Sequence, residues 1–214
     1  MDYKLVMFDL DGTVIDSGKG IMESAQFALD HFNMPNRPDD ELRLFVGPSL
    51  MDSFMNRYGF SEEKAREAVK YYRSVYSTEN LFHLTVYPGI KDVITSIKNK
   101  GKITVLVTSK PAEFASRILE KYGLSDCFSF IKSPSLTDPS SDKTKLINDA
   151  ISEVAINKEN AIMIGDRCFD ILGAAKANVD SIGVLYGYGS KEELTDSGCT
   201  YLAETPADIL KFIP

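Results

Sequence analysis

The chain alternates between two kinds of segment, and this alternation restricts the possible folds more than any other feature of the sequence. Short apolar runs rich in β-branched residues occur at 4–10, 103–109, 128–133, 161–166 and 181–186. Between them lie stretches whose apolar residues recur at every third or fourth position, at 90–100, 113–122, 143–154 and 171–177. The runs are typical of strands buried on both faces, and the stretches are typical of helices. We therefore expect an α/β fold, with a doubly wound parallel sheet as a Rossmann-like core.

One long segment breaks this alternation. From about residue 17 to residue 84 the sequence shows only helical patterns, at 21–32, 39–45, 50–58 and 62–77. Polar turns containing Pro or Gly separate these patterns, as expected between helices. The sequence therefore predicts a helical domain of residues 16–85, inserted after the first strand of a core that comprises residues 1–15 and 86–214.

Composition excludes several classes of function. The chain has 214 residues, 43% of them hydrophobic, and a net charge of −7. An acidic surface repels nucleic-acid phosphates, so we expect no nucleic-acid partner. No segment reaches the roughly 18 apolar residues of a membrane span, and the N-terminus does not resemble a signal peptide. The three cysteines are widely spaced, as expected of reduced thiols in the cytoplasm.

Two aspartates follow the first apolar run. Asp9 and Asp11 lie in the motif Phe8-Asp9-Leu10-Asp11-Gly12-Thr13, where the strand gives way to a loop. Ligands of open parallel sheets bind at the carboxyl ends of the strands. Close carboxylates repel each other unless a cation compensates, and Mg²⁺ prefers oxygen ligands. An exposed turn explains this motif equally well when it is considered alone.

Hydroxyl and ammonium groups follow later segments. Thr108 and Ser109 end the second run, where hydroxyls are able to bind phosphate oxygens, although helix capping is the simpler explanation. Lys143 lies in Ser141-Asp142-Lys143-Thr144-Lys145, just before an amphipathic stretch. A lysine there could neutralise a phosphoryl group or an aspartate, whereas most lysines are solvated. Lys145 is a competing candidate for the same role.

A second pair of acids follows the fourth run. Asp166 and Asp170 lie in Gly165-Asp166-Arg167-Cys168-Phe169-Asp170, a spacing that places both on one side of a helix start. Capping of that helix is the alternative explanation. Each motif is a weak or moderate signal alone. Together they are predicted to reach the same edge of one sheet, which favours a common site.

The set of motifs resembles the haloacid dehalogenase-like hydrolase superfamily over the whole chain. The four motifs of that superfamily are matched, in order, by Asp9-Leu10-Asp11-Gly12-Thr13, Thr108, Lys143 and the segment from Gly165 to Asp170. The chain is most similar to the phosphoglycolate phosphatase-like branch, through the segments Phe45-Val46-Gly47-Pro48-Ser49-Leu50 and Gly183-Val184-Leu185-Tyr186-Gly187-Tyr188-Gly189. The resemblance implies a helical cap over a Rossmann-like catalytic core.

The resemblance also implies roles for individual residues. Asp9 would attack phosphorus and carry an aspartyl-phosphate. Asp11 would protonate the leaving oxygen and later accept a proton from water. Thr108, with Ser109 beside it, and Lys143 would hold the phosphoryl oxygens. Lys143 departs from the Lys-Pro-x-Pro context that is common in this class.

A magnesium site is implied as well. Asp9, the backbone carbonyl of Asp11 and Asp166 would hold Mg²⁺, and Asp170 would support them without binding the ion. In the cap, the loop Gly47-Pro48-Ser49 is the candidate for contact with the leaving group, although an ordinary turn explains it almost as well.

The function expected from the resemblance is Mg²⁺-dependent hydrolysis of a small phosphate monoester, such as phosphoglycolate or a nucleoside monophosphate. Asp11 favours this chemistry, because the dehalogenases lack a carboxylate at that position and the transport ATPases have threonine. A phosphomutase or a pyrophosphatase would keep the same core, and a non-catalytic binding protein would keep the fold. The sequence indicates neither the physiological substrate nor the oligomeric state.

Overall fold

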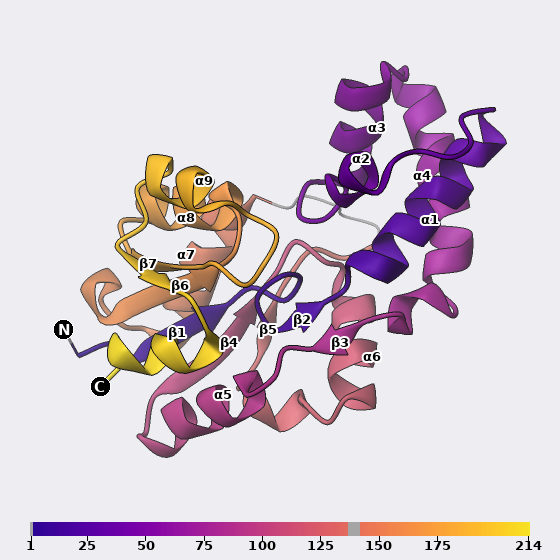
Figure 1. The fold of residues 1–214 in the computed structure, drawn as a ribbon. Helices are drawn as coiled ribbons and strands as arrows, with labels where there is room; N and C mark the ends of the chain where they lie inside the picture. Colours follow the sequence, from indigo (N-terminus) through magenta and orange to yellow (C-terminus); the bar gives the residue numbers. More distant parts are fainter. Residues whose placement is uncertain (1, 137–141) are drawn as a thin grey trace. The chain divides into compact units, whose positions relative to one another are not determined.

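The computed structural model describes residues 2–136 and 142–214, so Ser141 of the lysine motif lies outside the described residues. The chain divides into two compact units (Figure 1). The core unit comprises Met1–Ile15 and Val86–Pro214, and the helical unit comprises Asp16–Thr85. The assignment of these units as a catalytic core and a cap stays a prediction.

A six-stranded sheet forms the centre of the core unit. Its strands follow the order β5-β4-β1-β6-β7-β8, and every neighbouring pair is parallel. Their bounds are β1 Leu5–Phe8, β4 Ile103–Val107, β5 Ile131–Lys132, β6 Ala161–Gly165, β7 Asp180–Val184 and β8 Tyr201–Ala203. The predicted α/β class with a parallel sheet is confirmed. The sequence did not indicate β8, because three residues are too few to show a periodicity.

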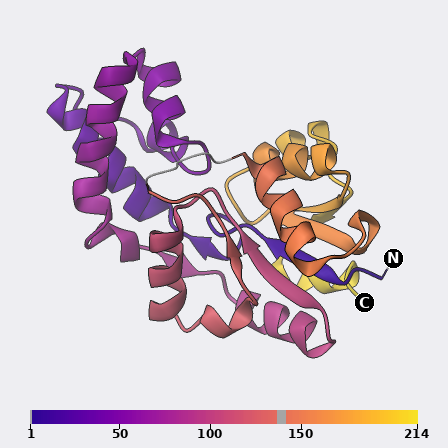
Figure 2. The same cartoon turned by 180° about the vertical axis from the view of Figure 1, so that it is seen from behind.

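Helices cover both faces of this sheet (Figures 1 and 2). Alternate residues of β1, β4 and β6, including Leu5, Val105 and Met163, form a buried cluster with α7 (Lys143–Val154) and α8 (Cys168–Ala177). The opposite face is covered by α5 (Ile90–Asn99) and α6 (Ala112–Lys121). Burial on both sides explains why the strands read as continuous apolar runs instead of alternating patterns. The described residues of this unit also include α9 (Lys191–Asp196) and the 3₁₀ helices Ser125–Cys127, Lys158–Asn160 and Pro206–Lys211.

The strand order creates a topological switch point. From β1 the chain passes to β4 and β5 on one side, and it returns to β6, β7 and β8 on the other. The loops after β1 and β6 therefore leave adjacent strands in opposite directions, and ligands of open parallel sheets bind at such a point, at the carboxyl ends of the strands. Asp9 follows β1 directly and Asp166 follows β6 directly, so the strand order places both acids at this switch point.

The helical unit contains α1 (Gly18–His31), α2 (Asp39–Arg43), α3 (Leu50–Tyr58), α4 (Glu62–Tyr76) and a 3₁₀ helix, Asn80–Phe82. The four expected helical patterns thus correspond to four α-helices. Aromatic side chains fill part of the interior, and Phe45 contacts Phe54 edge to face with ring centroids 5.0 Å apart. Two further short strands, β2 (Ile15–Asp16) and β3 (Thr85–Val86), pair in a separate sheet.

None of the helices within residues 2–136 and 142–214 is both long and apolar enough to cross a membrane.

Helix α7 has well-defined signals at both ends. Asp142 caps its start, because its side chain accepts hydrogen bonds from the N–H groups of Thr144 and Lys145 at 2.9 and 3.4 Å. The helix ends at Val154, and the next residue, Ala155, is exposed and adopts the left-handed conformation with φ +56°. This conformation costs an L-residue roughly 1–2 kcal/mol, whereas glycine adopts it freely.

We expect Ala155→Gly to stabilise the protein by about 0.5–1 kcal/mol, because relief of the left-handed strain exceeds the greater backbone entropy that glycine loses on folding. Urea unfolding measures the change. The matched control is Ala175→Gly, at an exposed position inside α8, which should destabilise by about 1 kcal/mol. Equal destabilisation by both variants would contradict the prediction.

Candidate active site

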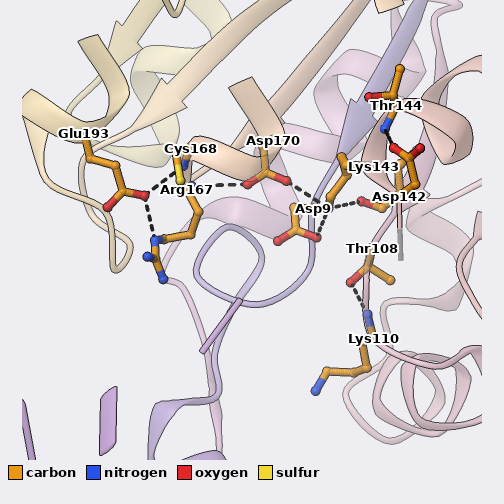
Figure 3. Close-up of polar contacts among 11 residues, drawn as sticks. Asp9, Thr108, Lys110, Asp142, Lys143, Thr144, Arg167, Cys168, Asp170 and Glu193 are labelled. Carbon is orange, nitrogen blue, oxygen red and sulfur yellow. Dashed lines mark hydrogen bonds and ion pairs between the residues drawn. The ribbon is translucent and has the colours of Figure 1, made fainter. Parts of the chain in front are cut away.

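A buried lysine joins two aspartates at the carboxyl edge of the sheet (Figure 3). Nζ of Lys143 lies 2.9 Å from Oδ1 of Asp9 and 2.8 Å from Oδ1 of Asp170. It also donates a hydrogen bond to the carbonyl of Val107 at 3.1 Å. Each group comes from a different element: Asp9 follows β1, Val107 ends β4, Lys143 begins α7, and Asp170 lies in the first turn of α8.

The geometry separates the two candidate lysines. The side chain of Lys143 is 6% exposed. Lys145 is 66% exposed and pairs with Asp149 one helical turn further along α7. Because Asp142 caps the helix immediately before Lys143, Lys143 occupies the first position of the helix and its side chain reaches the sheet edge. Of the two lysines, only Lys143 contacts Asp9 in the described part of the chain.

Asp166 completes a cluster of three buried carboxylates. One oxygen each from Asp9, Asp166 and Asp170 lie within 4.8 Å of one another. Oδ2 of Asp166 accepts a hydrogen bond from the N–H of Tyr188 at 2.8 Å. Its Oδ1 is buried and has no hydrogen-bond partner among the described residues. An orphaned carboxylate oxygen of this kind is suited to hold a divalent cation, and oxygen ligands are those that Mg²⁺ prefers.

Asp170 differs from Asp166 in its contacts. Its Oδ1 lies 2.8 Å from Nζ of Lys143, an ion pair that lacks hydrogen-bond geometry, and its Oδ2 accepts a hydrogen bond from the N–H of Arg167 at 3.2 Å. Each oxygen of Asp170 therefore faces a group of the protein, whereas Oδ1 of Asp166 does not, and this difference suits a supporting role for Asp170 beside a metal ligand. This contact also closes the first turn of α8, so the helix begins at Cys168 instead of at the expected residue 171.

Glu193 of α9 binds the residues at the start of α8, and no sequence motif indicated this role. Its Oε1 accepts hydrogen bonds from Nε of Arg167 and from the N–H of Cys168, both at 2.8 Å (Figure 3). Burial and the neighbouring Glu193 carboxylate raise the pKa of the Cys168 thiol to about 11. The thiol is therefore protonated at neutral pH, which argues against Cys168 as a nucleophile.

Thr108 and Lys110 lie together after β4. The buried Oγ1 of Thr108 accepts a hydrogen bond from the N–H of Lys110 at 3.1 Å. A hydroxyl that accepts in this way keeps its own proton to donate, for example to a phosphoryl oxygen. Nζ of Lys110 lies 3.2 Å from Oδ1 of Asp11. No role for Lys110 was expected from the sequence.

The two remaining predicted residues lie outside this group of contacts. Ser109 is partly exposed at the end of β4. Gly47 belongs to the helical unit, between α2 and α3, with φ +105°. The substrate contacts predicted for Ser109 and Gly47 stay predictions.

Electrostatics at the cluster favour a bound cation. Burial raises the pKa of Asp9 to about 7, and the charges of Asp170 and Asp11 add to this effect, while Lys143 opposes it. Burial, followed by repulsion from Asp170 and Asp9, places the pKa of Asp166 well above its usual range. Burial alone would lower the pKa of Lys143, but its pairs with Asp170 and Asp9 outweigh that effect and raise it. One ammonium thus faces three carboxylates, so a second positive charge would relieve the repulsion.

Glycine backbone surrounds Asp166 closely. A Cβ at Gly12, where φ is +82°, would lie 2.0 Å from Oδ2 of Asp166, and a Cβ at Gly187 would lie 2.3 Å from the Cβ of Asp166. A side chain at either position would displace the carboxylate. These glycines let the main chain approach a charged group directly.

A comparison with protein-family models identifies the family of the chain. Residues 6–184 match the model described as haloacid dehalogenase-like hydrolase. The chain belongs to this family. The resemblance expected from the sequence is thereby confirmed, as is the assignment of the chain as a hydrolase.

Similar proteins carry related descriptions. A solved structure described as a "predicted phosphatase" from Clostridium acetobutylicum has a TM-score of 0.95 and 40% identity, covering 99% of this chain and 98% of that one. A 5'-nucleotidase from Pseudomonas aeruginosa is 36% identical over 90% of this chain and 87% of its own. A phosphoglycolate phosphatase from Vibrio parahaemolyticus is 26% identical over 99% of this chain and 96% of its own.

One relative has a name from another class of enzyme. Tyrosine-protein kinase PtkA from Mycobacterium tuberculosis is 31% identical over 92% of this chain and 67% of its own length. The similarity to relatives therefore establishes the family more firmly than it establishes one reaction.

We expect Gly12→Ala to weaken Mg²⁺ binding at least about tenfold, the scale of changes that disturb the surroundings of a metal ligand. Calorimetric titration with Mg²⁺ measures the affinity. Gly198→Ala is the matched control, because Gly198 has the same φ of +82° but no atom within 4 Å of its added Cβ. It should cost about 1–2 kcal/mol of stability through backbone strain without affecting Mg²⁺. Similar Mg²⁺ affinities for the two variants would contradict the crowding argument.

We also expect Mg²⁺ to raise the melting temperature more at pH 7.5 than at pH 5.5. The pKa of Asp9 rises on folding from 3.8 to about 7. Between those values the folded, metal-free protein holds more protons than the unfolded chain, so its stability falls as pH rises. Mg²⁺ held by the deprotonated carboxylates would remove this penalty. Thermal melts of the wild type and of Asp9→Asn, with and without Mg²⁺ at both pH values, measure this difference. An equal Mg²⁺ effect on the melting temperature of the wild type at both pH values would refute the prediction.

Proposed function

We propose that this protein is a phosphoric monoester hydrolase that cleaves a small-molecule phosphate monoester through an aspartyl-phosphate on Asp9, with Mg²⁺ as cofactor. The observation that carries the proposal is the buried contact of Lys143 with Asp9 and Asp170, beside the orphaned oxygen of Asp166. Phosphoryl transfer chiefly requires positioning and neutralisation of charge. The site offers a carboxylate nucleophile, a fixed ammonium and a place for a cation.

The first step transfers the phosphoryl group to the enzyme. A carboxylate oxygen of Asp9 attacks phosphorus and forms a new P–O bond, while the bond from phosphorus to the ester oxygen breaks. Asp11 gives its proton to that oxygen, so the product leaves as a neutral alcohol. Lys143, held at Oδ1 of Asp9, and the hydroxyl of Thr108 stabilise the charge on the phosphoryl oxygens.

The second step releases phosphate. Asp11, now a carboxylate, takes a proton from water, whose oxygen attacks phosphorus as the bond to Asp9 breaks. Inorganic phosphate leaves, and both aspartates return to their starting states. Asp11 thus acts as acid and then as base, while Asp9 stays the nucleophile.

The acidic residues fit the proposed cofactor. Asp9, Asp166 and the backbone carbonyl of Asp11 would hold Mg²⁺, and Asp170 would keep Lys143 and the start of α8 in place. When bound, Mg²⁺ would neutralise charge on the phosphoryl group and on the carboxylates.

The proposed substrate is a small phosphorylated metabolite, and the names of the relatives suggest phosphoglycolate or a nucleoside monophosphate. In this proposal residues 16–85 close over the site as a cap that excludes water and selects the substrate, with Gly47 near the leaving group. A cytoplasmic location accords with the free state of all three cysteines.

We expect Asp9→Asn to abolish Mg²⁺-dependent release of phosphate from every member of a panel of phosphate esters. The panel includes phosphoglycolate and nucleoside monophosphates, and kcat/KM is compared across it. Lys143→Met should lower kcat/KM by about 10²–10³, the scale of removing one group that stabilises developing charge. Lys145→Met is the matched control, because that lysine lies in the first turn of the same helix but is exposed, and it should retain wild-type activity.

The panel also separates the alternatives. A phosphomutase would need a sugar bisphosphate for turnover, a pyrophosphatase would prefer pyrophosphate over all the esters, and a kinase would transfer phosphate from a nucleotide to tyrosine. Undiminished phosphatase activity of Asp9→Asn would overturn the assignment of the nucleophile.

A further inference from the structure

Two lysines reach the carboxyl edge of the sheet, and each contacts a different aspartate of the first motif. Lys143 pairs with Asp9, whereas Lys110 pairs with Asp11, with 3.2 Å between Nζ and Oδ1. Charge neutralisation at Asp9 therefore does not require Lys110. The contact between Lys110 and Asp11 therefore needs a separate explanation.

The sheet register brings the second pair together. β1 and β4 are parallel neighbours, and Phe8 lies opposite Leu106. Asp11 is three residues beyond Phe8, and Lys110 is four residues beyond Leu106. The two loops thus leave the sheet side by side, and their side chains meet at the edge where the chemistry of the proposed function takes place.

Burial makes this pair unusual. The side chain of Lys110 is 5% exposed and that of Asp11 is 13% exposed. Lysine is rarely buried so fully unless it is paired, and desolvation offsets much of the attraction within a buried pair. Such a pair is weak evidence for stability and better evidence for a fixed orientation of its members.

We propose that Lys110 is a positioning residue that holds the carboxyl group of Asp11 in the orientation required for proton transfer to the leaving group. The inference rests on the proposed function, in which Asp11 is the acid and base. A general acid must lie within hydrogen-bond reach of the oxygen it protonates, and a misplacement of about 1 Å costs on the order of 10²-fold in rate. The ammonium of Lys110 lies at Oδ1, so it fixes the rotation of the carboxyl group both when Asp11 is ionised and when Oδ2 carries the proton that is transferred.

Lys110 also links the acid to the phosphoryl-binding hydroxyl. Its backbone N–H donates to Oγ1 of Thr108, while its side chain holds Asp11. One residue thereby sets the direction of the Thr108 hydroxyl and of the Asp11 carboxyl group. A substitution such as Lys110→Met keeps the backbone N–H that Thr108 accepts and removes the ammonium that holds Asp11.

The experiment uses two substrates that differ in their need for a proton. Nitrophenolate leaves p-nitrophenyl phosphate without protonation, whereas the alkoxide of glycerol phosphate requires it. For Lys110→Met we expect kcat/KM to fall about 10–100-fold with glycerol phosphate, and less than about threefold with p-nitrophenyl phosphate. Lys110→Arg should restore most of the loss, and Lys110→Met should cause no further loss in an Asp11→Asn background. If the methionine variant does not fold, Lys110→Gln takes its place.

Lys102→Met is the matched control. Lys102 precedes the opposite end of β4, is 7% exposed, and pairs with Asp2 at the same distance of 3.2 Å. It should lower stability without changing the ratio of the two kcat/KM values. This control separates a general effect of losing a buried lysine from an effect on Asp11.

Equal losses of Lys110→Met with both substrates, or a further loss in the Asp11→Asn background, would overturn the positioning role alone. If the wild type hydrolysed neither ester, or if Asp9→Asn hydrolysed both, the proposed function would fail and this inference with it.

Discussion

The contact between Lys143 and the buried aspartates is the interaction on which the rest of the site depends. Asp9 and Asp170 are 8% and 2% exposed, and burial opposes the charge of each carboxylate. The ammonium of Lys143 lies within 3 Å of both. It can do so because Asp142 starts α7 at that point, and because the sheet brings the ends of β1 and β4 together. The cap of α7 and the order of the strands thus together determine where the ammonium group of Lys143 lies.

Much of the fold could be predicted from periodicity. The central strands are buried on both faces, so their apolar runs are continuous, and the helices between them have one apolar face. Prediction failed where elements were short. β8 has three residues and α9 has six, which is less than a periodic pattern needs. The start of α8 was placed three residues too late, because a contact between Asp170 and Arg167 closes its first turn.

The candidate site was predictable in part for a similar reason. Asp9, Thr108, Lys143 and Asp166 each follow or begin a recognisable element, and the carboxyl edge of a parallel sheet is a known place for ligands. The sequence could not separate Lys143 from Lys145, because the choice depends on which residue begins the helix. Glu193 and Lys110 were missed because their partners are remote: Glu193 lies 25 and 26 residues from the groups it binds. Only the folded arrangement reveals such pairs.

The glycines around Asp166 have a consequence for how this enzyme can diversify. A Cβ added at Gly12 or Gly187 would lie 2.0 or 2.3 Å from a side-chain atom of Asp166, and one at Gly189 would lie 2.0 Å from its backbone carbonyl oxygen. A boundary formed by main-chain atoms keeps the same shape whatever the neighbouring side chains are. It leaves no room for a side chain at these glycine positions. The residues that surround the Asp166 carboxylate therefore cannot be exchanged to change the substrate preference. New substrate preferences within such a scaffold must arise in parts of the protein where side chains, rather than backbone, form the boundary.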